Sequence, residues 1–290
     1  MPIKQADNLR GIVMMALAVG LLSLMDMGLK LLSPHYPPLQ VGALRGLASW
    51  PLIVIWIALS TGFRPLLNVR WPLHLLRGAL GIFMMAAFVF AIRSLPLTTA
   101  YTLFFVSPLI ITALSGPLLG ETVGLKRWLA ILAGFCGVLI ALRPTGEGVF
   151  TWAGLCVLLA ASAYALSAIT VRVLARSDST QSMMFWLISA MAFGSALLAA
   201  PNWVAIRPDH WMLIAAVGVL GALGQYAITE AFSSGEASVV APLEYTALVW
   251  ALSFDVLSGG PLPDGLLWLA AGVIVASGLY LMRLEHQKSA

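Results

Sequence analysis

The sequence has very little charge for its length. Of its 290 residues, 10% are Asp, Glu, Lys or Arg, whereas 60% are hydrophobic. A soluble domain carries about 25% charged residues, so this chain has too little charge to cover a surface that faces water. Its apolar runs reach the roughly 20 residues that cross a bilayer as a helix. The composition therefore predicts a polytopic helical membrane protein and excludes a soluble one.

Cysteine is scarce, and the motifs of several enzyme classes are missing. Cys136 and Cys156 lie inside apolar runs without the spacing of metal ligands, and we expect both to be small buried side chains. The chain has no G-x-x-x-x-G-K-[ST] loop for ATP and no H-E-x-x-H zinc motif. We therefore expect no metal, no cofactor and no enzymatic activity. A membrane enzyme is the alternative from another class, and it would need a catalytic pair such as Asp26 with Asp255.

Basic residues are in small excess and do not gather in one stretch. The formal net charge is +4, and we interpret it loop by loop rather than as a surface for nucleic acid, so no nucleic-acid partner is expected. Proline, glycine and charged residues divide the chain into ten apolar spans. Their approximate limits are 9–32, 39–60, 72–93, 97–118, 125–143, 152–174, 181–200, 209–232, 237–257 and 265–283.

The connections between these spans differ in charge. Cytoplasmic loops of membrane proteins carry an excess of Lys and Arg. With the N-terminus inside, ten basic residues fall on the inner side and four on the outer side, while Arg45 and Arg77 fall within spans. This imbalance predicts a multi-pass membrane protein with both termini in the cytoplasm.

Two stretches resemble each other at a constant offset of 134 residues. They are SPLIITALSGPLLGE (107–121) and APLEYTALVWALSFD (241–255), which share five identical positions, Pro108 with Pro242 among them. Composition bias in a chain rich in Leu and Ala is the alternative explanation for one such window. A repeat would divide the ten spans into two sets of five.

The loop charges favour the repeat. Because five is an odd number, the second set of spans must lie upside down relative to the first. Lys126 and Arg127 follow the first stretch, which ends at Glu121, whereas the loop after Asp255 contains no basic residue. Inverted repeats of this kind are typical of carriers whose binding site lies at the repeat interface near the bilayer midplane.

With ten spans in a five-plus-five repeat, the chain resembles the EamA-type carriers of the drug/metabolite transporter superfamily. The recurring pattern is a proline, an acidic residue near the helix end, and a following helix that contains glycine. PLEYTALVWA resembles the YddG- and RhtA-like amino-acid exporters in particular. The pattern departs at Asp255, where the superfamily has a glutamate followed by a basic loop.

The resemblance implies a fold and a mechanism. We expect an all-α membrane protein of ten transmembrane helices in two inverted five-helix repeats, residues 1–146 and 147–290. A central cavity would open alternately to each side of the membrane. Carriers of this superfamily move amino acids and related small metabolites, usually outward.

Charges inside the spans are the first candidates for function, because a charge at the bilayer centre costs at least ~2.5–3.5 kcal/mol on insertion scales. Glu244 is the strongest candidate, since a rise of ~1.5 Å per residue places it roughly 10–12 Å from the start of its span. We expect its carboxylate to bind a substrate ammonium group or to carry a proton. Asp255, about three turns later on the same helix face, is expected to serve ion coupling or gating.

Other charges in the spans lie closer to the ends. Asp26 and Lys30 can pair along one helix face, and with Arg45 they are expected to form an outer polar cluster. Arg45 would meet the carboxylate of a substrate, whereas Asp26, Lys30 and Glu230 are expected to act in ion coupling or gating. A structural ion-pair network is the alternative for this cluster. Arg77 is expected to reach the aqueous interface along its aliphatic stem.

Aromatic and small residues complete the predicted site. A buried Tyr or Trp needs a partner for its polar atom, so the deep aromatic residues are expected to line the cavity; core packing is the alternative for each. Pro108 and Pro242 each remove one helix hydrogen bond and are expected to act as hinges. Glycine pairs in GALRG (42–46), GPLLG (116–120) and GETVG (120–124) predict close helix contacts. The aromatic candidates for substrate binding are Tyr245, Tyr101, Tyr164, Trp186, Trp250 and Tyr226.

The predicted function follows from these features. We expect a secondary transporter that exports amino acids or related small metabolites by alternating access around the central cavity. The alternative is an importer of a different metabolite, S-adenosylmethionine or a nucleoside-like compound, on the same fold. The expected partners are the small-molecule substrate and the lipid bilayer, with the chain as a monomer.

Overall fold

The computed structural model describes residues 7–60, 62–92, 103–142 and 151–247, together with Ala100, Trp250 and single positions between 265 and 283. All the regular structure in these residues is helical. Among them, six helices are long and apolar enough to cross a membrane. Their ranges are Asn8–Leu32, Pro38–Leu59, Trp71–Ala91, Trp152–Leu174, Thr180–Asn202 and Pro208–Ser234.

The helix boundaries agree closely with the predicted spans. The predicted spans 97–118, 237–257 and 265–283 lie partly outside the described residues. The α-helices are α1 (Asn8–Leu32), α2 (Pro38–Leu59), α3 (Trp71–Ile92), α5 (Ser107–Leu119), α6 (Leu125–Leu142), α7 (Trp152–Leu174), α8 (Thr180–Ser189), α9 (Ser195–Ala199), α10 (Trp211–Ser234) and α11 (Ala237–Val240).

Capping residues explain several of these boundaries. The side chains of Asp7, Thr151 and Ser179 precede α1, α7 and α8, and each accepts a hydrogen bond from a backbone N–H in the first turn. Such caps satisfy donors that the helix itself leaves unpaired. At the other end of α5, Gly120 adopts a φ of 73°, the left-handed conformation that commonly ends a helix.

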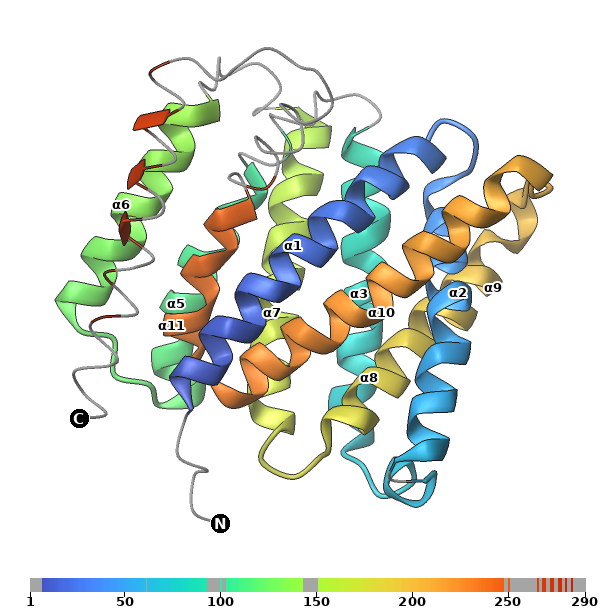
Figure 1. Ribbon diagram of the computed structural model, residues 1–290, viewed down its shortest axis with the longest axis horizontal. Coiled ribbons are helices and arrows are strands. Elements are labelled where there is room, and N and C mark those ends of the chain that lie inside the picture. Colours follow the sequence, from blue (N-terminus) through green and yellow to red (C-terminus); the bar gives the residue numbers. More distant parts are fainter. Residues whose placement is uncertain are drawn as a thin grey trace.

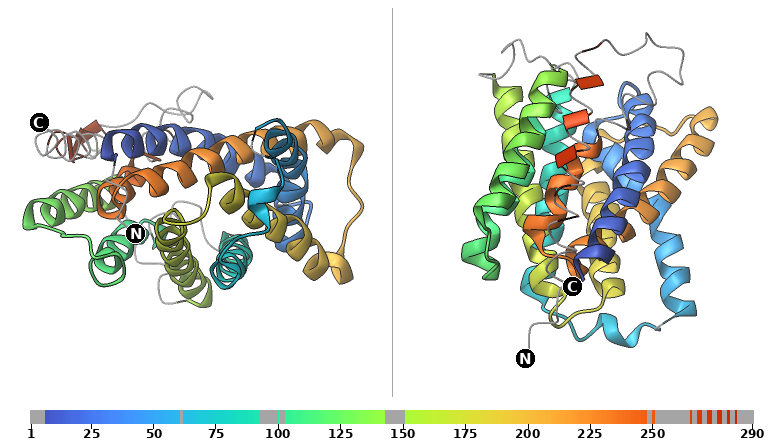
Figure 2. Two further views of the ribbon diagram at one scale, coloured as in Figure 1. Left: turned by 90° about the horizontal axis from the view of Figure 1, so that it is seen from below. Right: turned by 60° about the vertical axis from the view of Figure 1, so that its left-hand side comes forward.

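The helices form two layers. α1 packs along α10, and α3 packs along α7, which also contacts α5. Figure 1 shows α1 and α10 side by side across the front of the bundle. Seen from below in Figure 2, α1 and α10 lie in one layer, and α3, α5 and α7 lie in the other. Helices distant in sequence thus enclose the space between the layers.

Two spans are interrupted at the depth of the bundle interior. Between α8 and α9, the segment Ala190–Gly194 forms a π-helical turn, a local irregularity that is often found at functional sites. After α11, the chain continues as a 3₁₀ helix over Ala241–Thr246. Pro242 is the second residue of this 3₁₀ segment.

Pro108 also differs from its prediction. It was expected inside a helix, but α5 begins at Ser107, so Pro108 lies in the first turn. The N–H groups of a first turn have no intrahelical acceptor, so a proline costs nothing there. Both repeat prolines therefore lie where a helix begins or changes type, and their role as hinges stays a prediction.

Only one of the three glycine motifs makes close helix contacts among the described residues. A Cβ atom on Gly42 would lie 3.1 Å from Met85 Cγ, and one on Gly46 would lie 2.5 Å from the backbone nitrogen of Ala192. Gly116 has its nearest described neighbour at 3.8 Å, and Gly120 and Gly124 have none within 4 Å. In the described part of the chain, GALRG is therefore the motif that packs a helix tightly, against the π-helical turn.

Gly46→Ala is expected to lower the thermal stability of the protein. The added methyl group would meet backbone, which cannot move aside as a side chain can, and overpacking of this kind typically costs ~1–3 kcal/mol. Gly116→Ala is the matched control, because it adds the same atom inside α5, where no described residue is closer than 3.8 Å. Thermal unfolding in detergent should show a loss for Gly46→Ala only; equal transitions for both variants would contradict the tight contact.

Candidate functional site

A cavity of about 240 Å³ lies inside the bundle. Residues of α1, α2, α3, α7, α8 and α10 line it, together with the interrupted span around Glu244. Its walls are mainly apolar, and polar residues from several helices interrupt them. The polar lining residues are Ser23, Asp26, Lys30, Ser33, Arg45, Tyr164, Ser167, Gln225 and Glu244.

One end of the cavity is built around Glu244, which is only 8% exposed. The Tyr164 hydroxyl donates a hydrogen bond to Oε1 of Glu244 at 2.8 Å. The Ser107 hydroxyl donates to Oε2 at 3.4 Å. Because charge is costly in a bilayer, such residues normally face a wet cavity or the bundle interior. Glu244 is such a residue, because it is buried in the bundle and also lines the central cavity.

The backbone around Glu244 contributes to this end. Ser107 is the first residue of α5, so the positive end of that helix lies beside the Glu244 carboxylate, an arrangement that stabilises negative charge. Glu244 itself belongs to the 3₁₀ segment of the second half. Irregular backbone at membrane depth is tolerated where it lines a cavity or is buried in protein. This end therefore joins the two halves of the chain.

The opposite end of the cavity contains the predicted outer cluster. Asp26 and Lys30 of α1 and Arg45 of α2 all line it, and the Lys30 residue is exposed. Arg45 is buried, and its charge interacts with Asp26. The guanidinium lies against α10 at Gly221, where a Cβ atom would be 3.3 Å from Nε. The cavity thus extends from Glu244 to the far end of α1.

Apolar and aromatic side chains form the middle of the cavity. Met84 and Met85 of α3 line it, together with Phe88. The ring centroids of Phe88 and Phe104 are 5.5 Å apart, and those of Phe104 and Tyr164 are 5.6 Å apart. These separations are typical of interacting aromatic pairs. A row of rings therefore leads along the wall to the Glu244 end.

Tyr245 is buried beside Glu244 without lining the cavity. Its residue is 1% exposed, and its ring contacts Phe105 and Phe135. Its hydroxyl has no hydrogen-bond partner in the described part of the chain. A Cβ atom on Gly134 would lie 2.8 Å from this ring, so Tyr245 packs tightly against α6.

Of the remaining aromatic candidates, Trp186, Tyr226 and Trp250 are described, and they are not among the lining residues. Trp186 donates its Nε1 hydrogen to the Leu66 carbonyl oxygen at 3.0 Å. Tyr226 packs edge-on against Trp56. Trp250 is 41% exposed. Tyr101 and Asp255 lie outside the described residues.

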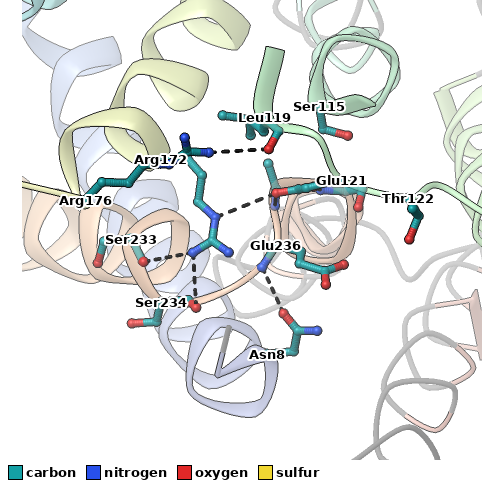
Figure 3. A network of polar contacts seen from close by, with 12 residues as sticks. Asn8, Ser115, Leu119, Glu121, Thr122, Arg172, Arg176, Ser233, Ser234 and Glu236 are labelled. Atoms are coloured by element: carbon teal, nitrogen blue, oxygen red, sulfur yellow. Dashed lines mark hydrogen bonds and ion pairs between the residues drawn. The ribbon is translucent and has the colours of Figure 1, made fainter. Parts of the chain in front are cut away.

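A polar network joins the helices at the end of the bundle where α1 begins, and we call it the closed-end network (Figure 3). Both carboxylate oxygens of Glu121 accept backbone hydrogen bonds, from Ala237 at 2.9 Å and from Ser238 at 3.1 Å. Arg172 Nε lies 3.7 Å from Glu121 Oε1. The same guanidinium donates to the carbonyl oxygens of Ser233 and Ser234. Glu121 therefore caps α11 and links it to α7.

Further contacts extend this network across both halves. Arg127 pairs with Glu236 at 2.5 Å, and the backbone N–H of Glu236 donates to Asn8 Oδ1 at 2.8 Å. Arg10 pairs with Glu230 at 2.6 Å. The closed-end network thus consists of ion pairs and hydrogen bonds among α1, α6, α7, α10, α11 and the loop at Glu121.

A second cavity, of about 250 Å³, lies at this end. Arg10, Arg172 and Glu230 line it, as does Asp178 in the connection between α7 and α8. Burial raises the pKa of Asp178, but hydrogen bonds from Ser177, His74 and the Arg70 backbone outweigh it and leave the pKa below its usual value. Glu230, predicted to act in ion coupling or gating, lies in this cavity and not in the central one.

Sequence reasoning did not assign several of the residues in these two sites. Glu121 was recognised as part of the repeat, and its position at the end of the motif is the signal that marks it. Ser107 and Gln225 carried no signal, because single polar residues are common in membrane helices. Arg77 was expected to reach the interface, which is wrong, since it is 2% exposed and hydrogen-bonds inside the bundle.

Comparisons with known proteins agree with this architecture. A model described as the EamA-like transporter family matches residues 9–143 and again residues 151–283. A solved crystal structure matches this one with a TM-score of 0.82, and the match covers 96% of this chain and 99% of the other. The two sequences are 22% identical, so this similarity shows the fold alone.

Characterised relatives carry several different names. A riboflavin transporter of Vibrio cholerae is 34% identical over 82% of this chain and 81% of its own. An S-adenosylmethionine uptake transporter of Rickettsia bellii is 27% identical over 81% of each chain. The pseudopaline exporter CntI of Pseudomonas aeruginosa is 25% identical over 91% of this chain and 93% of its own. Two of these relatives are named as transporters and the third as an exporter, each of a small organic molecule.

Proposed function

The chain belongs to the EamA-like transporter family, and we propose that this membrane transporter moves a flat heteroaromatic metabolite of the riboflavin class across the bacterial inner membrane. The observation that carries the proposal is the order of groups along the central cavity. Phe88 packs against Phe104, and Phe104 packs against Tyr164, which donates a hydrogen bond to Glu244. The methionines of α3 and the charged residues Asp26, Lys30 and Arg45 line the same cavity.

Riboflavin has the matching order of chemical groups. Its fused rings offer a flat surface for aromatic and methionine side chains, which bind such faces well. Its ring carbonyls and its polyol chain need hydrogen-bond partners at either end. The riboflavin transporter of Vibrio cholerae, at 34% identity, supports this substrate class above the amino acids predicted from sequence.

Export of an amino acid or a derivative of one is the second candidate. It is favoured by one observation: Glu244 and Arg45, of opposite charge, both line the same cavity. A zwitterion could place its ammonium group at Glu244 and its carboxylate at Arg45. The named exporter among the relatives supports outward movement on this fold.

Alternating access is proposed as the mechanism of transport. The central cavity reaches the end of α1 beside the exposed Lys30, whereas the closed-end network ties the other end together. With both termini in the cytoplasm, as the loop charges predict, this conformation opens outward. The two family matches, residues 9–143 and 151–283, support a division into halves near residue 146.

Counterflow in liposomes tests the proposed substrate. Vesicles are loaded with unlabelled riboflavin, S-adenosylmethionine or a mixture of amino acids, and entry of each labelled compound is followed, with release measured in parallel. We expect saturable riboflavin exchange that empty liposomes do not show. Exchange of amino acids without any riboflavin exchange would replace the first candidate by the second.

A further inference from the structure

Arg77 is a buried cation that the proposed function has not used. It lies on α3 and is 2% exposed. Nη1 donates to the Met183 carbonyl oxygen at 2.8 Å, and Nη2 donates to the Thr229 hydroxyl at 3.2 Å. In the described part of the chain, no carboxylate lies within ion-pair distance of it, and its Nε has no acceptor.

This environment is costly for a structural residue. Removing an ion from water carries a large penalty that an oppositely charged neighbour normally offsets. Two neutral acceptors hold the guanidinium in place, but they do not neutralise its charge. Ionisable residues retained inside membrane spans pair with one another or with backbone carbonyls, and they generally mark a path for substrate or ions.

The position of Arg77 points to such a path. Gly81, one helical turn further along α3, lines the central cavity, as does Gln225 of α10. Met183 lines the second cavity. Gln225 Nε2 donates to the Thr229 hydroxyl at 3.3 Å, and that hydroxyl also accepts from Arg77. A row of polar groups therefore runs from one cavity to the other, and Arg77 is its charged member.

We propose that Arg77, through its bonds to Met183 and Thr229, holds the transport path closed in this conformation, that it contacts the substrate at this point when the path opens, and that it selects for metabolites with carbonyl or carboxylate groups. When the two cavities join, the guanidinium donates to these acceptors in place of Met183 and Thr229. The inference rests on the proposed function for the passage of a metabolite through the bundle, but not on its identity.

Thiol accessibility tests whether Arg77 lies on the path without any assumption about the substrate. Cys136 is exposed and Cys156 half-buried, contrary to the burial expected of both, so Cys136→Ala and Cys156→Ala come first. Gln225→Cys then reports on the cavity floor in oriented membrane vesicles. Arg77→Met should raise labelling by an impermeant reagent from the side of the second cavity about tenfold or more, the factor that loss of ~1.4 kcal/mol produces.

The same thiol-labelling assay provides the control variants and the result that would overturn the proposal. Arg77→Lys keeps the charge and should leave that labelling low, and Thr229→Val, which removes one acceptor, should have an intermediate effect. Size-exclusion profiles confirm that each variant is folded. If Arg77→Met leaves labelling from the second cavity unchanged in folded protein, Arg77 does not close the path, and the proposal is overturned.

Ligand discrimination tests the selectivity. Binding of lumiflavin, which is neutral, and of a carboxymethyl flavin, which is anionic, is followed by quenching of flavin fluorescence. The preference of the wild type for the anion should fall about tenfold in Arg77→Met, the loss typical of one hydrogen bond to a charged group, and Arg77→Lys should retain most of it. If Arg77 had only a structural role, Arg77→Met would weaken the binding of both flavins equally. An unchanged ratio of the two affinities would therefore contradict the proposal. Absence of flavin binding in the wild type would instead reject the riboflavin class, and the thiol assay would still decide the role of Arg77.

Discussion

Glu244→Gln is expected to reduce the initial rate of substrate counterflow by about 10- to 100-fold while the protein remains folded. Hydrogen bonds to a charged group contribute ~1.5–3 kcal/mol, and each 1.4 kcal/mol is about a factor of ten. The amide has nearly the same volume and can still accept from Tyr164 or Ser107. The change therefore removes the charge that faces the cavity and little else.

Tyr245→Phe provides the matched control for this result. Tyr245 is the next residue along the chain and equally deep, but it packs against Phe105 and Phe135 and is not among the residues that line the cavity. Its substitution should change the counterflow rate by no more than about twofold, as expected for a change that leaves the binding groups in place. Tyr164→Phe, which removes the 2.8 Å bond to Glu244, should fall between the two. A loss in Tyr245→Phe as large as that in Glu244→Gln would contradict the assignment of Glu244 to the binding surface.

The second large effect is expected at the closed-end network. Glu121→Ala removes the ion-pair partner of Arg172 and the acceptor of two backbone N–H groups at the start of α11. Loss of one partner from a buried ion pair typically costs ~3–5 kcal/mol. Both side chains are largely buried, at 7% and 12% exposure, so solvent screens this interaction only weakly. The melting temperature should fall by several degrees, and the conformation with the network broken should gain population.

Two controls separate this effect from a general sensitivity to charge. Glu121→Gln keeps an oxygen that can accept from the start of α11 and should be milder. Asp209→Asn breaks the ion pair with Arg207, in which both side chains are more than half exposed, and exposed pairs of this kind contribute little. Thermal unfolding followed by tryptophan fluorescence gives the comparison. Similar melting temperatures for Glu121→Ala and Asp209→Asn would show that the network does not hold this end together.

The sequence predicted the membrane spans and the most deeply placed charge because both depend on the bilayer. Long apolar runs leave few alternatives to membrane helices, and the boundaries of α1 and α7 are within one residue of the predicted limits. Glu244 was identified from depth alone. Asp26, Lys30 and Arg45 were expected together at one end, and the cavity contains all three.

Other features of the site could not be predicted from the sequence, because they depend on how the helices turn and pack in three dimensions. The direction of Tyr245 depends on the 3₁₀ segment Ala241–Thr246, which turns each residue further about the axis than an α-helix does. Contacts such as that of Asn8 with Glu236 join residues more than 200 positions apart, and no local pattern encodes them. The burial of Arg77 depends in the same way on how α3 packs against α8 and α10.

Substrate identity is encoded still less directly. The cavity lining comes from six helices and an interrupted span, so its shape appears only once they are packed. Relatives of this chain are accordingly named as transporters or exporters of different compounds, namely riboflavin, S-adenosylmethionine and pseudopaline.

Distances between spin labels at the two ends of the bundle test the central claim most directly. One pair, at the exposed residues Leu9 and Ser177, spans the closed end, and the other, at the exposed Pro34 and Phe90, spans the open end. If one cavity serves the two sides in turn, saturating substrate should populate a state in which the first distance is longer and the second is shorter. Distances that stay fixed, or that lengthen together, in protein that catalyses counterflow would contradict the account.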